Sequence, residues 1–194
     1  GNAFDAAVAV SAALAVVEPI GSGLGGGGFY LLHRASDGLD VMVDAREKAP
    51  AAASRDMFLD KDGNVEPALS RGSALSAGIS GEPAGMELLA QKYGRLPLAV
   101  SLAPAIRHAK EGYPLYPLLQ ANIQRKRDIF ATQPEVAAVW LRDGESPALG
   151  TIIRQPDLAR TLERLARHGV RDFYMGELSR KLVSGVRKLG GIWT

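Results

Sequence analysis

The chain has 194 residues, enough for one domain with a sizeable hydrophobic core. Hydrophobic residues make up 46% and charged residues 23%, and the net charge of only +2 gives no electrostatic case for a nucleic-acid surface. The absence of cysteine excludes disulfides, thiolate metal ligands and a cysteine nucleophile.

The N-terminal part predicts a helix, a glycine-rich loop and a β-hairpin. The apolar run over residues 6–17 is too short to span a bilayer and predicts a buried helix, which Asn2 or Asp5 would cap. The run GSGLGGGG over residues 21–28 predicts a loop. Two short apolar runs separated by Ala-Ser-Asp-Gly predict a hairpin over residues 29–34 and 39–44.

The rest of the chain is mainly helical, so the sequence as a whole predicts an α+β fold. Residues 51–82 are polar and predict an irregular segment. Apolar periodicity bounded by proline and glycine predicts helices over residues 83–93, 98–111, 115–130, 156–168 and 176–189. Residues 133–151 predict a loop with a short strand near 136–141.

Most candidate motifs favour structural roles. The glycines of residues 21–26 match G-x-G-x-x-G, but they follow a helix and precede a strand, the reverse of a dinucleotide site. The histidines lie far apart without metal-ligand spacing: His33, His108 and His168. A polar cluster lacks the closing glutamate of a calcium loop and predicts a turn: Asp60, Asp62 and Asn64. No complete nucleophile–base set can be named.

Arg46 is the one candidate ligand. It follows an apolar run within the sequence DAREKAP, residues 44–50. The planar guanidinium fork suits bidentate capture of a carboxylate, and Asp44 or Glu47 could hold it in position. The alternative is a surface salt bridge with either acid, and the residues alone leave both interpretations open.

Several distinctive sequence motifs, in order along the whole chain, resemble those of the large subunit of γ-glutamyltranspeptidases. They lie in residues 1–9, 23–29, 44–50, 77–85, 93–97, 102–106, 155–162, 173–176 and 190–194. The resemblance implies an N-terminal-nucleophile hydrolase with a four-layer αββα sandwich, of which this chain is a partial, helix-rich portion. It also implies that Arg46 grips the α-carboxylate of the γ-glutamyl group, and that the glycine loop packs at the sheet edge nearby.

The activity implied by the resemblance is cleavage of γ-glutamyl amides such as glutathione, with transfer of the γ-glutamyl group to water or an amino acid. A precursor would cut itself, and the nucleophile would be the first threonine of the small subunit. No metal or organic cofactor is implied. Thr194 aligns with a threonine inside the large subunit and has no free amine, and the same holds for Thr132, Thr151 and Thr161.

We therefore expect residues 1–194 to be a single-domain fragment of the large subunit, continued on both sides in the precursor and inactive alone. Its partners would be the small subunit and a γ-glutamyl substrate, with no nucleic acid, no membrane span and another copy of the chain as a further option. The resemblance favours a periplasmic or secreted location. Two alternatives stay open: an acylase for glutaryl-β-lactams or poly-γ-glutamate, and a non-catalytic scaffold.

Overall fold

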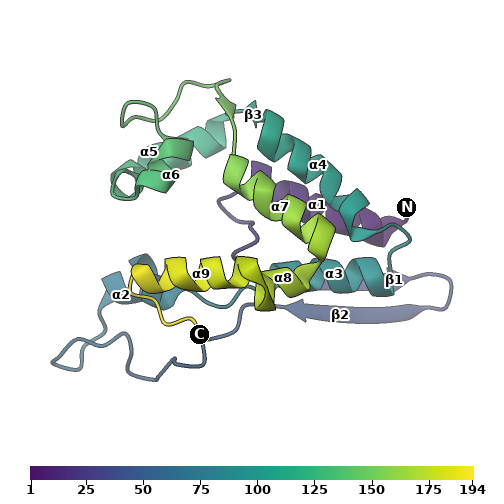
Figure 1. Ribbon diagram of the computed structural model, residues 1–194, viewed down its shortest axis with the longest axis horizontal. Helices are drawn as coiled ribbons and strands as arrows, with labels where there is room; N and C mark the ends of the chain where they lie inside the picture. Colours follow the sequence, from purple (N-terminus) through teal and green to yellow (C-terminus); the bar gives the residue numbers. More distant parts are fainter. The chain divides into compact units, whose positions relative to one another are not determined.

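The computed structural model describes all of residues 1–194 (Figure 1). The chain separates into two compact units, residues 1–23 with 89–167, and residues 24–88 with 168–194. The prediction of one domain over the whole chain stays a prediction. None of the helices is both long and apolar enough to cross a membrane.

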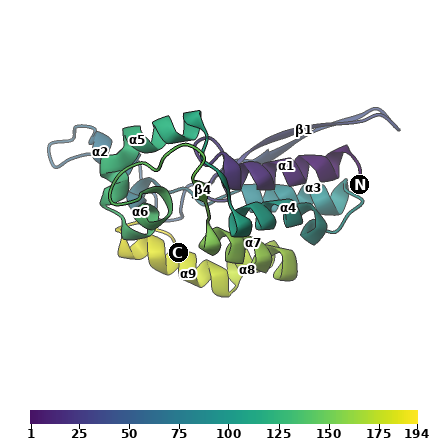
Figure 2. The ribbon, with the colours of Figure 1, turned by 90° about the horizontal axis from the view of Figure 1, so that it is seen from above.

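The first unit is built on helix packing. Its elements are α1 (Ala3–Val17), α4 (Leu98–Glu111), β3 (Tyr113–Pro114), α5 (Pro117–Ala131), α6 (Pro134–Trp140), β4 (Ile152–Ile153) and α7 (Pro156–His168). Helix α1 packs along α4, and α5 contacts α6 (Figures 1 and 2). Small and apolar side chains form the core between α1 and α4, including Val8, Ala12, Val16, Leu102 and Ala105.

Helix α1 begins with a capping box. The Asn2 side chain accepts hydrogen bonds from the amides of Phe4 and Asp5, and Asp5 accepts the Asn2 amide at 2.6 Å. Asp5 also accepts the amides of Arg95 and Leu96, at 2.9 and 3.1 Å. Burial raises the pKa of the Asp5 carboxyl, but these backbone hydrogen bonds outweigh burial and hold the pKa below its ordinary value. The predicted cap at Asn2 is confirmed.

The second unit contains the hairpin and a smaller set of helices. Strands β1 (Gly28–Arg34) and β2 (Leu39–Ala45) pair antiparallel from Gly28 opposite Ala45 to Arg34 opposite Leu39. The helical elements are α2 (Pro67–Gly72), the 3₁₀ helix Ala74–Ser76, the first part of α3 (Glu82–Lys92), α8 (Val170–Met175) and α9 (Glu177–Lys188). The hairpin predicted over residues 29–34 and 39–44 therefore agrees with β1 and β2 to within one residue. The helix predicted over residues 176–189 agrees with α9 to within one residue at each end.

The predicted strand near residues 136–141 is wrong, because this segment forms α6. Pro134 stands in the first turn of the helix, where a backbone N–H has no helical acceptor, so the lack of an N–H in proline costs no hydrogen bond. Glu135 places a negative charge at the positive end of the helix dipole. The irregular segment 51–82 also contains α2 and the 3₁₀ helix. Helix α8 and the short β3–β4 pair were not predicted.

Candidate functional site

The candidate site is the strand end at Ala45 and Arg46, which is threaded between two turns. Gly27 lies on one side and Gly81 on the other. A Cβ added to either glycine would overlap the carbonyl oxygen of Ala45, so only glycine fits at both positions. Close backbone approach therefore explains Gly27 within the glycine run and confirms the predicted packing role at that position.

Ser80 ties these two turns together. Its hydroxyl is buried and contacts the carbonyl oxygens of Leu24 and Gly26, the latter at 2.9 Å. The amides of Gly81 and Glu82 also donate to the Gly26 carbonyl, at 3.0 and 3.1 Å. All of these hydrogen bonds join the glycine loop to the turn before α3.

Hydrogen bonds also fix the backbone at Arg46 and just after it. The Asp44 carboxylate accepts the Arg46 amide at 2.9 Å. Two residues later, Lys48 and Ile79 exchange backbone hydrogen bonds at 2.9 and 2.7 Å. Arg46 therefore leaves the sheet from a rigid stretch of backbone.

Of the two interpretations that the sequence left open for Arg46, the salt bridge is observed, and the role as a carboxylate ligand stays a prediction. Nη1 of Arg46 lies 3.3 Å from Oε2 of Glu47, so a salt bridge is present, while 58% of the side chain stays exposed. That Glu47 oxygen is buried and accepts no hydrogen bond, so the ion pair compensates its charge. Asp44 contacts the backbone of Arg46 rather than its guanidinium. The remaining guanidinium donors can bind an anion.

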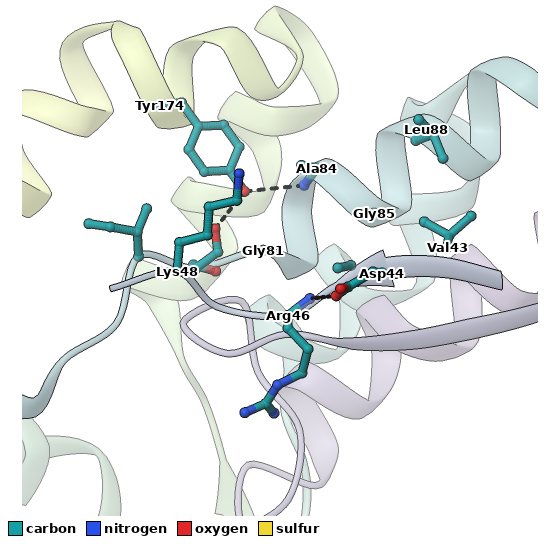
Figure 3. A pocket seen from close by; sticks show the side chains of 12 residues that line it. Val43, Asp44, Arg46, Lys48, Gly81, Ala84, Gly85, Leu88 and Tyr174 are labelled. Carbon is teal, nitrogen blue, oxygen red and sulfur yellow. Dashed lines mark hydrogen bonds between the residues drawn. The ribbon is translucent and has the colours of Figure 1, made fainter. Parts of the chain in front are cut away.

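A hollow of about 460 Å³ lies beside this strand end. Apolar side chains of β2 and α3 line one part of it, and Lys48 and Tyr174 line another. The Tyr174 hydroxyl donates to the Ser80 carbonyl at 2.9 Å and accepts the Ala84 amide at 3.3 Å. Figure 3 shows the Arg46 guanidinium pointing away from Tyr174 and Leu88, although Arg46 is among the lining residues.

These side chains can bind an anion, but they do not form a nucleophile–base pair. The Ser80 hydroxyl already donates to backbone carbonyl oxygens. Burial raises the pKa of the Tyr174 hydroxyl, which keeps this group protonated. The sequence interpretation assigned no role to Ser80 or Tyr174. Ser80 lies in the motif AGISGEPAG and Tyr174 in the motif FYMG, and both motifs resemble the family. That resemblance was the only feature of the sequence that could have pointed to these two residues.

The other candidate residues do not gather at this site. His33 forms an exposed pair with Asp40 at 2.8 Å, His108 lies in the last turn of α4, and His168 ends α7. The predicted turn near Asp60 is confirmed, since its carboxylate accepts the amides of Asp62 and Asn64. No group of three or more His, Asp or Glu side chains is placed to hold a metal ion.

Comparisons with known proteins agree with this geometry over the full chain. The sequence profile of the gamma-glutamyltranspeptidase family matches residues 1–194. The glutathione hydrolase proenzyme of Escherichia coli is 38% identical over 195 residues, covering 100% of this chain and 33% of that protein. The chain thus spans about a third of the length of this relative.

Two solved structures show that the similarity extends to the fold. The gamma-glutamyltranspeptidase of Helicobacter pylori overlays with a TM-score of 0.95 and 39% identity, covering 100% of this chain and 55% of that one. A cephalosporin acylase from Bacillus halodurans overlays with a TM-score of 0.83 and 31% identity, covering 100% and 36%. The predicted fold class, a partial and helix-rich portion of the N-terminal-nucleophile hydrolase sandwich, is confirmed. Its sequence and its fold both place the chain in the gamma-glutamyltranspeptidase family.

Proposed function

We propose that this chain is the substrate-binding part of an enzyme that cleaves γ-glutamyl amides such as glutathione and transfers the γ-glutamyl group to water or an amino acid. Membership of the gamma-glutamyltranspeptidase family supports the reaction class. The observation that carries the proposal is at Arg46, whose backbone is locked between two turns while its guanidinium stays exposed.

In this proposal, Arg46 binds the α-carboxylate of the γ-glutamyl group. The guanidinium can donate two parallel hydrogen bonds to one carboxylate, and the ion pair with Glu47 orients the fork. Holding that end of the substrate presents the γ-carbonyl in one orientation, which lowers the barrier to attack. Because the guanidinium points away from the hollow, the substrate would bind on the other side of the strand end (Figure 3).

The nucleophile would come from a partner polypeptide. We propose the N-terminal threonine of a small subunit cut from the same precursor, whose hydroxyl attacks the γ-carbonyl while its α-amino group takes the proton. The α-amino group then gives that proton to the departing amine as the amide bond breaks, and water or an amino acid takes the γ-glutamyl group from the threonine ester. The proenzyme name of the Escherichia coli relative is in keeping with such processing. The proposal includes no metal or organic cofactor, and it assigns the enzyme to the periplasm or the cell exterior on family resemblance.

Substitutions of Arg46 in the complete precursor test this proposal, with release of a chromogenic γ-glutamyl amide as the assay. Arg46→Ala removes charged hydrogen bonds worth about 1.5–3 kcal/mol. We therefore expect kcat/KM to fall about 10- to 150-fold, mostly through KM, with self-cleavage intact. Arg46→Lys keeps the charge without the fork and should recover part of the loss.

The matched control is Arg55→Ala, because Arg55 is exposed and pairs with a neighbouring acid, Asp56. It should leave kcat/KM unchanged. An Arg46→Ala precursor with an unchanged KM for γ-glutamyl substrates would overturn the proposal.

The likeness to a cephalosporin acylase favours a second candidate, an acylase for glutaryl-β-lactams. Poly-γ-glutamate, the other alternative, keeps an α-carboxylate on every unit, so Arg46 would bind it as it binds any γ-glutamyl amide. A glutaryl group lacks the α-carboxylate that Arg46 would bind. Such an enzyme should therefore hydrolyse glutaryl amides at a rate that Arg46→Ala does not change. A precursor that neither cuts itself nor turns over either amide would instead indicate a non-catalytic scaffold.

A further inference from the structure

Helix α9 carries more net positive charge than the chain as a whole. Its 12 residues include four Lys or Arg and one acid, a net charge of +3, whereas all 194 residues together reach only +2. The acid, Glu177, pairs with Lys181 at 2.7 Å. Positive charge is therefore concentrated on α9, where it can attract an anionic partner.

The cations of α9 lie on one side of the helix. The sequence Arg-Lys-Leu occurs twice, at residues 180–182 and 187–189. Seven residues complete nearly two helical turns, so the two Arg–Lys pairs differ in direction by only about 20° and lie about 10.5 Å apart along the axis. All four residues are exposed and form one basic face: Arg180, Lys181, Arg187 and Lys188.

The apolar residues of α9 lie on its other side. Leu178 is buried, and Leu182, Val183 and Val186 are half-buried. The helix is thus amphipathic, and the basic face is the side turned to solvent.

Most of the basic face is not neutralised within the chain. Arg180, Arg187 and Lys188 form no ion pair with an acid of this chain. On α7, by contrast, Arg160 and Arg167 each pair with an acid of the same helix. Since no internal carboxylate offsets these three charges on α9, they attract anions outside the chain.

Large apolar side chains are exposed at both ends of α9. Met175 ends α8, two residues before α9 begins, and is 78% exposed. Leu189 is the C-cap of α9 and is 72% exposed. A soluble polyanion offers nothing apolar to cover them. A lipid membrane does, because apolar side chains can enter the boundary between headgroups and acyl chains while cations bind the anionic headgroups.

We propose that the basic face of α9, together with Met175 and Leu189, is a docking surface for an anionic phospholipid membrane. The helix lies along the membrane surface, with its four cations among the headgroups. Four Lys or Arg on an amphipathic helix are enough for a patch that binds anionic lipid, and each cation near the surface strengthens binding about 5-fold. This role goes beyond the cleavage of γ-glutamyl amides and does not depend on Arg46.

Co-sedimentation of the complete precursor with vesicles tests the inference. Vesicles of phosphatidylcholine mixed with phosphatidylglycerol should bind the protein, and vesicles of phosphatidylcholine alone should not. The double variant Arg187→Gln, Lys188→Gln should bind the anionic vesicles about 30-fold more weakly, because two cations near the surface are lost. Salt at about 1 M should abolish binding, since the screening length falls to about 3 Å.

The matched control is the double variant Arg125→Gln, Lys126→Gln, which removes an exposed, adjacent Arg–Lys pair from α5. It should change vesicle binding by less than about 2-fold, because charges more than a screening length from the membrane contribute little. Leu189→Ser should weaken vesicle binding about 4- to 15-fold, the effect of one or two buried methylene groups. None of these substitutions should change kcat/KM for a γ-glutamyl amide in the absence of vesicles.

Equal losses in the two double variants would mean that overall charge, and not the basic face, attracts the protein, and would overturn the inference. Binding to soluble polyphosphate as tight as binding to the vesicles, with no effect of Leu189→Ser on either, would make a soluble polyanion the occupant and would also overturn it. A precursor that turns over γ-glutamyl amides but does not bind anionic vesicles would refute this inference and leave the proposed function intact. A precursor that binds these vesicles through α9 but has no turnover would do the reverse.

Discussion

At the scale of single residues, the site depends on Ser80 as much as on Arg46. Ser80 does not touch the guanidinium. Its buried hydroxyl joins the glycine loop to the turn before α3, and Gly27 and Gly81 from these two segments enclose the backbone at Ala45. Ser80 is therefore a positioning residue for Arg46.

Replacing Ser80 with alanine tests this role. The change leaves the Leu24 carbonyl without its hydrogen bond, at about 1–3 kcal/mol. We expect the melting temperature of residues 1–194 to fall by about 2–4 °C for each kcal/mol lost. In the precursor, KM for the γ-glutamyl amide should rise while kcat changes little, because the arginine is displaced but the reacting groups are not.

The matched control is Ser70→Ala, whose exposed hydroxyl donates to Pro67 at 3.3 Å and should matter by less than about 0.5 kcal/mol. A Ser80→Ala protein with lowered melting temperature but unchanged KM would reduce Ser80 to a purely structural residue.

At the scale of elements, the start of α1 makes stability depend on pH. The pKa of Asp5 is lowered in the folded chain, so its contribution is complete above the unfolded pKa of about 3.9 and disappears as pH falls through the folded value. We expect Asp5→Asn to be less stable than wild type at pH 7. The gap in the free energy of unfolding should close as the pH falls below about 4.

Urea unfolding between pH 2.5 and 7 measures this gap, over a range of pH chosen around the ordinary carboxyl pKa of about 4. Asp62→Asn, in an exposed turn, is the control and should follow wild type throughout. A gap for Asp5→Asn that stays constant across this range would show that the charge of Asp5 is not what the amides of Arg95 and Leu96 require.

The elements also show how far sequence alone could reach. Helix α4 and helix α7 carry local boundary signals, and both were predicted at their observed bounds. Helix α6 was mistaken for a strand, because a short apolar segment fits both periods and only its first two residues, Pro134 and Glu135, favour a helix. Arg46 stood out by its chemistry. Ser80 and Tyr174 did not, because they reach the site only through contacts distant in sequence.

At the scale of the whole molecule, we expect residues 1–194 alone to release no product from a chromogenic γ-glutamyl amide. The threonines inside the chain have no free amine, and two of them, Thr132 and Thr161, donate their hydroxyls to helix carbonyls at 2.7 and 3.0 Å. The complete precursor, assayed in parallel, is the positive control. Turnover by the isolated chain that Arg46→Ala abolishes would mean that it carries its own nucleophile.

The glycine run before β1 has a consequence for how the protein tolerates mutation. A Cβ on Gly27 would overlap the strand-end carbonyl, whereas a Cβ on Gly25, two residues earlier, would meet nothing within 4 Å. A saturation library should therefore return many side chains at position 25 and glycine alone at position 27. Two glycines of the same short run, Gly25 and Gly27, would then differ sharply in how freely they can change during evolution.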